Sequence, residues 1–424
     1  MKFLNCKEQG YTNSSSNITN EIPPQIIETV QEIISSVKKN GDKAVIEYTE
    51  KFDAFSVKDF PLEIPPSDLK KAYDSIDDEL KSSLEHAAKR IEAFHMEQKE
   101  DSWQRKDEYG SVLGQLINPI ERAGLYIPGG KACYPSSVLM NGIPAKIAGV
   151  KEIIMVVPSP GGELNNVVLA AAYIAGVNRV FRVGGAQAVA ALAFGTETIP
   201  KVDKVVGPGN IYVATAKQLL FGYIDIDMFA GPSEILIIAD KTANPQYIAA
   251  DFLSQAEHDE RATAILITND LELAKKAEEE IIRQTRKSRR REIIEKSLDN
   301  NGEIIVVNTL DEAFLIANER GPEHLEVMTQ NPEQHIPKVK NAGALFLGDY
   351  SPEPIGDYIA GPNHVLPTMG TSRFFSPLGV YDFVKKTSLI YLNKSTFNTI
   401  NKDALILADI EGLDAHAESI RIRD

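Results

Sequence analysis

Two short motifs in the chain join a histidine to a neighbouring acid or amide. In DFLSQAEH, Gln255 and His258 are three residues apart, so a helix would place them on one face. In GPEHL, Glu323 and His324 are adjacent, behind a glycine and a proline that constrain the turn. Adjacent carboxylate and imidazole groups suit general acid–base catalysis. A helix cap or core amide in the first motif, and an exposed turn in the second, would explain the same residues.

Two further motifs repeat this pairing of histidine with a carboxylate. GDYIAGPNHVLPT contains Asp357 and His364 in a loop constrained by two glycines and two prolines, and the C-terminal tail contains Glu411 and His416. Four of the seven histidines therefore lie in such motifs, which is the composition of a histidine and aspartate metal site. The spacing H-E-x-x-H is absent from the sequence, so a zincin-type protease is not supported.

Glycine-rich turns follow several predicted strands, where they let the backbone approach a ligand closely. They are PGG (128–130), VGGAQA (183–188), VGPGN (206–210) and FAGPSE (229–234). None is a dinucleotide fingerprint, because no third glycine follows Gly209. GLYIPGGKA (124–132) is too long for a P-loop and has Ala132 where a hydroxyl should bind Mg²⁺. Taken alone, each of these glycine-rich segments is explained better as an ordinary turn that connects a strand to a helix.

These motifs lie in an alternation of strands and helices that begins near Gly124. Apolar runs such as 153–158, 234–240 and 264–268 are typical of buried parallel strands, and helical patterns separate them. Two such series predict an α/β fold with two doubly wound, Rossmann-like units. An N-terminal helical segment and a helical tail after Ser376 complete the predicted organisation.

The pattern predicts four segments. They are an N-terminal arm (1–20), an α/β domain with the metal and acid–base residues (21–125 plus 234–376), an α/β domain with the glycine turns (126–233) and a helical tail (377–424). His86 and His95 are nine residues apart in the N-terminal helical segment, a spacing that does not suit paired ligands on one helix face. Both are predicted to lie on the surface.

The amino-acid composition argues against several classes of protein. The 424 residues include 45 basic and 60 acidic side chains, a formal net charge of −15, which disfavours nucleic acid and anionic membranes as partners. Two cysteines cannot build a disulfide framework and indicate a reducing compartment. The first twenty residues contain no apolar signal region, and no apolar run approaches membrane-spanning length. We therefore expect a cytoplasmic protein that does not associate with membranes.

Considered together, the polar motifs and the glycine turns resemble the histidinol dehydrogenase family from about Ile120 to the C-terminus. The resemblance rests on YIPGG, PSSVLMNGIPA, VGGAQA, KVDKVVGPGN, AGPSE with DFLSQAEH, GPEHL, GDYIAGPNHVLPT and AHAESIRIR. This combination is specific to the family, as a single glycine loop is not.

The resemblance implies a reaction and a set of roles. L-histidinol would be oxidised through L-histidinal to L-histidine, the last step of histidine biosynthesis, with NAD⁺ as co-substrate and one Zn²⁺ per subunit positioning the substrate. The zinc ligands would be Gln255, His258, Asp357 and His416, and the acid–base pair would be Glu323 and His324. Both sets would also contact substrate, together with Ser233, His364 and Glu411. The NAD site would include Tyr126, Gln187 and Asn210.

The resemblance also implies a homodimer with shared active sites, in which the tail carrying Glu411 and His416 reaches the partner subunit. Zn²⁺ has no redox chemistry, so it would hold and polarise the substrate while hydride passes to NAD⁺. Two other functions could use the same residues. A zinc-dependent hydrolase would show no dependence on NAD⁺, and a non-catalytic nucleotide-binding protein would bind NAD⁺ but ignore histidinol.

Overall fold

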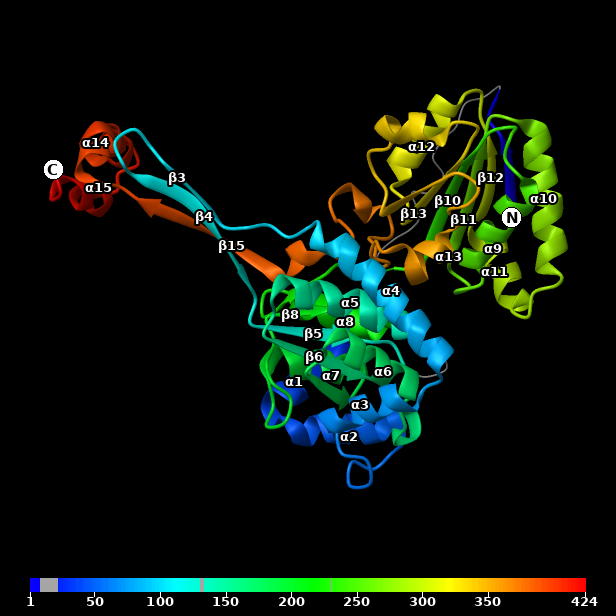
Figure 1. Ribbon diagram of the computed structural model, residues 1–424, viewed down its shortest axis with the longest axis horizontal. Coiled ribbons are helices and arrows are strands. Elements are labelled where there is room, and N and C mark those ends of the chain that lie inside the picture. The colour runs from blue at the N-terminus through cyan, green and yellow to red at the C-terminus, as the bar shows by residue number, and fades with distance from the viewer. Residues whose placement is uncertain (8–21, 130–132, 230) are drawn as a thin grey trace. The chain divides into compact units, whose positions relative to one another are not determined.

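The chain forms two compact units in the computed structural model (Figure 1), which describes residues 1–7, 22–129, 133–229 and 231–424. Unit 1 comprises Met1–Gln98 and Glu121–Phe383, and unit 2 comprises Lys99–Ile120 and Val384–Asp424. Most of the predicted N-terminal arm, residues 130–132 of the first glycine turn and Ala230 of FAGPSE lie outside the described residues.

One sheet of unit 1, the β10 sheet, has six parallel strands. Their spatial order is β1 (Lys2–Asn5), β12 (Gly302–Val306), β11 (Thr263–Thr268), β10 (Glu234–Ala239), β13 (His324–Met328) and β14 (Ala344–Leu347). The connecting helices are α9 (Pro245–Ala256), α10 (Leu271–Thr285), α11 (Arg291–Asn301) and α12 (Leu310–Arg320). Ile235 and Ile237 of β10 pack into one core and Leu236 and Ile238 into another, so the strand is buried on both faces.

The second sheet of unit 1, the β5 sheet, has the order β2 (Glu63–Ile64), β7 (Arg179–Arg182), β6 (Glu152–Val157), β5 (Arg122–Tyr126), β8 (Lys204–Val206) and β9 (Asp225–Ile226). Only β2 is antiparallel to its neighbour. The helices that connect the strands of the β5 sheet are α5 (Pro135–Ala148), α6 (Asn166–Ala175), α7 (Gly185–Phe194) and α8 (Ile211–Leu220). Both sheets run outward in two directions from a central strand, β10 or β5, which confirms the predicted α/β fold with parallel sheets.

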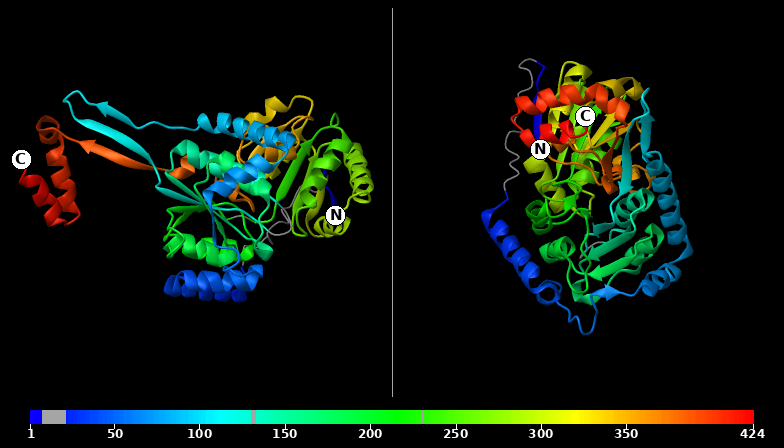
Figure 2. Two further views of the ribbon diagram at one scale, coloured as in Figure 1. Left: turned by 60° about the horizontal axis from the view of Figure 1, so that its bottom comes forward. Right: turned by 90° about the vertical axis from the view of Figure 1, so that its left-hand side faces the viewer.

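The N-terminal helices pack differently from the predicted grouping of 21–125 with 234–376. They are α1 (Pro24–Asn40), α2 (Asp42–Asp53), α3 (Pro66–Ser75) and α4 (Asp78–Met96). Val30, Ile33 and Val37 of α1 share a core with residues of α7 and α8 of the β5 sheet. Figure 2 shows the blue N-terminal helices beside the green part of the chain that forms this sheet. Of the described N-terminal residues, only those of β1 pair with the β10 sheet, beside β12. An apolar helix face requires a partner but does not specify which sheet supplies it, so the helical pattern left this choice open.

His95 corrects a second expectation about this segment. Its side chain is 0% exposed on α4, whereas His86 is exposed as predicted. The helix presents His95 inward with Leu84, Ala87 and Ile91, so the surface prediction for His95 was wrong.

Unit 2 combines a three-stranded antiparallel sheet with two helices. The strands are β15 (Val384–Tyr391), β4 (Val112–Pro119) and β3 (Trp103–Lys106), and the helices are α14 (Lys394–Ile410) and α15 (Asp414–Arg421). The expected purely helical tail is therefore wrong for its first part, because β15 pairs with β4 over eight residues. Within the described ranges, none of the helices combines the length and apolar character needed to cross a bilayer.

The short helical turns of unit 1 complete the fold. They are η1 (Pro160–Gly162), η2 (Pro332–Lys338), α13 (Glu353–Ile355), η3 (Gly356–Ala360), η4 (Thr371–Arg373) and η5 (Val380–Phe383).

Candidate functional site

Glu323 and His324 lie at the amino end of β13, beside β10. Helix α12 ends at Gly321, whose φ of 58° provides a left-handed cap, and the strand then begins at His324. Glu323 is 7% exposed and His324 is 4% exposed. The alternative of an ordinary exposed turn is therefore wrong, because both titratable side chains are buried.

The contacts of His324 define its protonation. Its Nδ1 lies 2.9 Å from the carbonyl oxygen of Glu234. Since a carbonyl oxygen only accepts, Nδ1 carries the proton and Nε2 keeps a lone pair. Nε2 has no hydrogen-bond partner among the residues that the structure describes. Burial lowers the pKa of His324, so the side chain is a neutral imidazole whose Nε2 can accept a proton.

The pKa of Glu323 is shifted in the opposite direction from that of His324. Burial raises its pKa well above the usual range, and the nearby Glu234 and Asp357 carboxylates raise it further. Its Oε2 accepts a hydrogen bond of 2.8 Å from the backbone nitrogen of Glu234 and lies 3.6 Å from His324 Nδ1. The two side chains are thus a neutral base and a readily protonated acid in contact, which is an acid–base arrangement.

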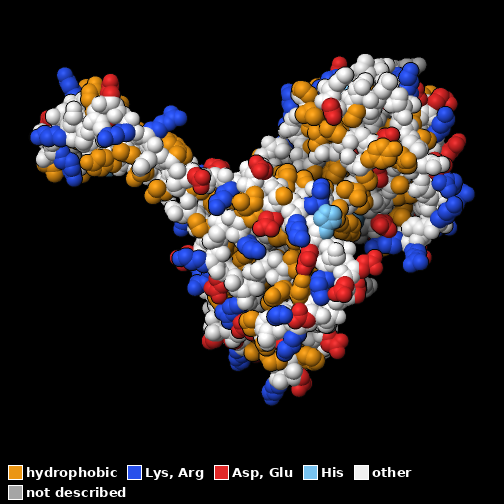
Figure 3. Space-filling model, in the orientation of Figure 1, with side chains coloured by type: hydrophobic (Ala, Val, Ile, Leu, Met, Phe, Trp, Pro, Cys, Tyr) orange, Lys and Arg blue, Asp and Glu red, His pale blue; other side chains and the backbone are white. Residues whose placement is uncertain are grey.

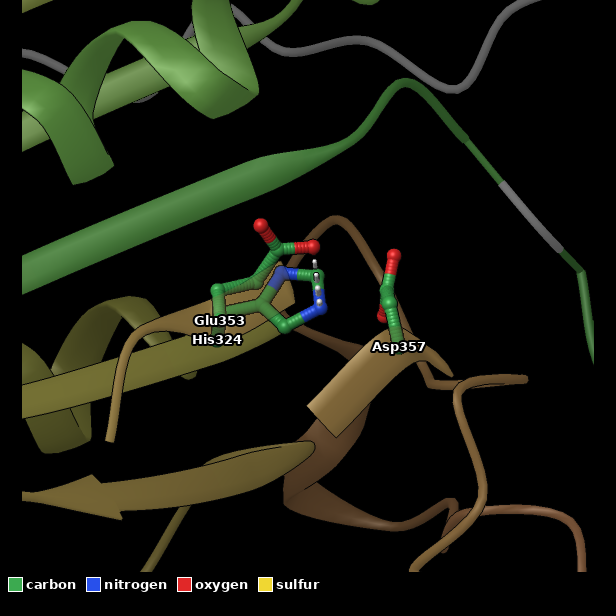
Figure 4. Close-up of side chains that lie close together, drawn as sticks. All are labelled: His324, Glu353 and Asp357. Carbon is green, nitrogen blue, oxygen red and sulfur yellow. Dashed lines mark ion pairs between the residues drawn. The ribbon is translucent and has the colours of Figure 1, made fainter. Parts of the chain in front are cut away.

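A third carboxylate, Glu353, meets His324 and Asp357 (Figure 4). One ligand atom from each of the three lies within 4.8 Å of the others. Glu353 is 2% exposed, and its Oε1 is 3.9 Å from His324 Nε2. Glu353 was not predicted from the sequence, although its spacing of four residues from Asp357, about one helical turn, could have indicated it.

Gln255 supplies an unpaired acceptor next to this group. Its side chain is 1% exposed on α9, and its Nε2 lies 3.1 Å from His324 Nδ1. This contact is not a hydrogen bond when Nδ1 donates to the Glu234 carbonyl, because both nitrogens then carry hydrogen. Its Oε1 is buried without a hydrogen-bond partner in the described part of the chain. A buried orphan oxygen is costly unless it binds something. The donor set of an unpaired amide oxygen, an imidazole and two carboxylates therefore fits a cation.

The structure places other predicted site residues near this end of the β10 sheet. Ser233 directly precedes β10, and His258 follows the end of α9 with an exposed side chain. His364 Nδ1 lies 3.0 Å from the Asp357 carbonyl and its Nε2 lies 3.4 Å from Ser137 Oγ. Burial lowers the pKa of His364 to about 4. Asp357 and His364 are thus joined, while His258 lies outside the buried triad.

The three residues predicted for NAD follow the carboxyl ends of strands in the β5 sheet. Tyr126 ends β5, and its hydroxyl accepts a hydrogen bond of 3.0 Å from the nitrogen of Gly185. Gln187 is buried near the start of α7. Asn210 caps α8 after β8 by accepting from the nitrogens of Tyr212 and Val213. Carboxyl ends of parallel strands and helix N-termini are usual positions for a dinucleotide.

Glu411 and His416 belong to unit 2. Glu411 follows the last residue of α14, and His416 lies on α15. Both side chains are exposed.

A buried pair of carboxyl groups lies beyond Glu353. Asp251 and Glu326 are neighbouring buried carboxyl groups, and Glu326 Oε1 accepts a hydrogen bond of 2.9 Å from the backbone nitrogen of Glu353. Burial raises the pKa of Asp251 to about 6 and that of Glu326 well above its usual range. The two carboxyl groups therefore resist ionising together.

We expect this pair to make stability depend on pH. An acid whose pKa is raised in the folded chain stabilises the fold most when the pH is below its unfolded-state pKa. The free energy of unfolding then falls as the pH rises from the unfolded-state pKa towards the folded-state pKa. Between pH 4 and pH 8, the melting temperature of metal-free Asp251→Asn should therefore fall less than that of the metal-free wild type. The difference should correspond to about 2 kcal/mol in the free energy of unfolding. The exposed Asp349→Asn is the matched control. Parallel pH curves for wild type and Asp251→Asn would contradict the buried pair.

Comparisons with known proteins agree on one family. The family model described as Histidinol dehydrogenase matches residues 17–424. A histidinol dehydrogenase of Aquifex aeolicus is 54% identical over 395 residues, covering 93% of this chain and 92% of that protein. One of Geobacter sulfurreducens is 48% identical over 427 residues and covers both chains fully. The crystal structure of histidinol dehydrogenase from Elizabethkingia anophelis superposes with a TM-score of 0.92 at 35% identity, covering 100% of this chain and 98% of that one.

Proposed function

The chain belongs to the histidinol dehydrogenase family and is thus an oxidoreductase of histidine biosynthesis, and from this premise we propose the course of its reaction. The enzyme oxidises L-histidinol to L-histidine through L-histidinal, passes two hydrides to two NAD⁺, and works as a cytoplasmic homodimer with one Zn²⁺ per subunit. The observation that carries the proposal is the neutral His324. Its Nδ1 lies 3.6 Å from the buried Glu323 carboxyl, and its unpaired Nε2 lies 3.9 Å from Glu353 in the group formed with Asp357.

His324 acts first, on the alcohol. Its Nε2 takes the hydroxyl proton while hydride leaves the carbinol carbon for NAD⁺, which gives the aldehyde. Glu323 then accepts a proton from the water that adds to the aldehyde carbon. A second hydride leaves the hydrated carbon for a second NAD⁺, and the resulting carboxylic acid releases its remaining proton to solvent to give the carboxylate. Glu323 must be ionised to take this proton, and burial, which raises its pKa, makes the ionised carboxylate a stronger proton acceptor.

Gln255, His258 and Asp357, with the partner subunit's His416, would hold the zinc. The buried Oε1 of Gln255 has no other use among the described contacts, and burial raises the pKa of Asp357 to about 9, a cost that a bound cation relieves. When bound, Zn²⁺ positions and polarises the substrate without redox change. An amide is a weak ligand and suits a site that must also admit substrate atoms.

The remaining predicted residues complete the substrate and nucleotide sites. Ser233, His364 and the partner subunit's Glu411 would contact histidinol, and Tyr126, Gln187 and Asn210 would line the NAD site. Gln187 supports this assignment with a buried Oε1 that has no partner in the described part of the chain.

Unit 2 carries a surface that suits a second copy of the chain. Leu113 and Ile390 are cross-strand neighbours on β4 and β15 and are 52% and 69% exposed. On α14, Leu407 and Ile410 are 62% and 78% exposed. Figure 3 shows apolar side chains among Lys and Arg on the visible face of this unit. Large apolar side chains left exposed on both the strands and a helix of one small unit are typical of a protein interface, which supports the homodimer.

The direct test is NADH absorbance after mixing enzyme, L-histidinol and NAD⁺. We expect NADH to form only when all three are present. A zinc-dependent hydrolase would convert its substrate without NAD⁺, and a nucleotide-binding protein would retain NAD⁺ without forming NADH. Either result would overturn the proposal.

We expect metal removal to stop both oxidation steps and leave the fold intact. Chelation should abolish NADH formation from both histidinol and histidinal, because both would use the same zinc. Circular dichroism should be unchanged, since the cores of both sheets are formed by apolar residues. Turnover at the wild-type rate in protein shown to be metal-free would refute the metal assignment.

A further inference from the structure

The segment that carries Asp357 and His364 is held by α4, a helix in which the sequence shows no chemistry. Arg90 Nε donates to the Ile359 carbonyl at 2.7 Å, and its Nη2 donates to the Ala360 carbonyl at 3.1 Å. These two carbonyls lie at the end of the helical turn η3, where a helix leaves its own acceptors unpaired. The guanidinium fork of Arg90 therefore closes the turn that presents Asp357.

The backbone of α4 also touches this segment. Gly361 has a φ of 119°, and a Cβ there would lie 2.8 Å from the Arg90 carbonyl oxygen. A side chain at this position would push the segment away from the helix. The close approach fixes the spacing between α4 and the turn that follows η3.

His95 holds the next part of the segment. Its Nδ1 donates to the Ile91 carbonyl at 2.8 Å, and its Nε2 lies 3.3 Å from Asn363 Nδ2. Burial lowers the pKa of His95, and a neutral ring that donates through Nδ1 accepts through Nε2. Asn363 Nδ2 also donates to the Met140 carbonyl at 2.6 Å, and its Oδ1 accepts from the nitrogen of Val365 at 2.9 Å. The residue before His364 is thus fixed at both ends of its amide.

We infer that Arg90 and His95 are positioning residues for the reaction. They act through Asp357 and His364, which are themselves linked by the 3.0 Å contact between His364 Nδ1 and the Asp357 carbonyl. The inference rests on the proposed function for the roles of Asp357 and His364. Catalytic geometry tolerates displacements of only about 0.5 Å, so loosening this segment should weaken zinc and histidinol binding together and leave NAD⁺ binding unchanged.

The test compares Arg90→Met and His95→Leu with Lys89→Met and His86→Leu, which replace exposed residues of the same helix. Zn²⁺ affinity of the apoprotein is measured by competition with a chromogenic chelator. We expect Arg90→Met and His95→Leu to lose about 10–100-fold in Zn²⁺ affinity, the usual effect of removing a residue that orients a metal ligand. Arg90→Lys should recover part of the loss, since an ammonium can pair with one of the two carbonyls.

Hydrogen–deuterium exchange and kinetics separate positioning from general destabilisation. Exchange should accelerate within residues 356–364 and remain unchanged in the β5 and β10 strands, and KM should rise for histidinol but not for NAD⁺. Arg90 is exposed, so its replacement keeps the test available if His95→Leu does not fold. Unchanged exchange and Zn²⁺ affinity in Arg90→Met would overturn the inference. Wild-type protein that neither binds Zn²⁺ nor forms NADH would refute the proposed function instead, and the exchange result would still decide whether α4 holds the segment.

Discussion

Glu323→Gln should lower the rate of histidinal oxidation by about 10²–10⁴-fold, the usual contribution of a general base. Glutamine keeps an oxygen that can accept from the Glu234 nitrogen, as Glu323 Oε2 does at 2.8 Å, so the local structure should survive. It cannot take a proton from water. Stopped-flow measurement of NADH formation from histidinal checks this expectation.

His324→Ala should impair the alcohol step as well, because it removes the unpaired Nε2 that receives the hydroxyl proton. Both variants are measured with histidinol and with histidinal, and His86→Ala, an exposed histidine on α4, is the control. Small and equal losses for both variants on both substrates would contradict the separate roles of Glu323 and His324.

Mixing two inactive variants should restore activity if each site uses two chains. Homodimers of His324→Ala and of His416→Ala should each be nearly inactive. After they are denatured and refolded together, about half of the dimers are mixed, and one of the two sites in each mixed dimer joins an intact body to an intact tail. Activity should recover to about a quarter of wild type on this two-fold symmetry.

The control for this experiment is a direct measure of subunit exchange, for example with differently tagged variants. No recovery of activity in a sample with confirmed mixed dimers would show that each site is formed by a single chain.

The central strands of both sheets could be predicted from the sequence, because a strand buried on both faces is an unbroken apolar run. β6 (Glu152–Val157), β10 and β11 have this pattern. β13 was missed because His324 and Glu326 interrupt its apolar residues. His324 and Glu326 are buried beside Glu353, within the candidate site. The polar residues that the site requires therefore hide the apolar pattern of the strand.

The strands of unit 2 gave little signal for a different reason. β4 and β15 pair across some 270 residues of sequence, and much of their surface is exposed. Neither the long-range pairing nor the partner that would cover Leu113 and Ile390 can be inferred from local periodicity.

Some of the site residues could also be predicted from the sequence, and others could not. The motifs containing Gln255, Glu323 and Asp357 indicated the chemistry, and the structure brings these side chains together at the amino ends of β10 and β13. Glu353 and His95 could not be recognised from residue type alone. Their significance comes from the contacts with His324 and Asn363, which are set by tertiary packing.

The proposed four-electron oxidation by one enzyme is tested by the number of NADH formed per histidinol. With limiting L-histidinol and excess NAD⁺, we expect two NADH and one L-histidine for each histidinol consumed. The products are counted by absorbance and by chromatography. One NADH per histidinol with accumulation of histidinal, or no NADH at all, would contradict the account.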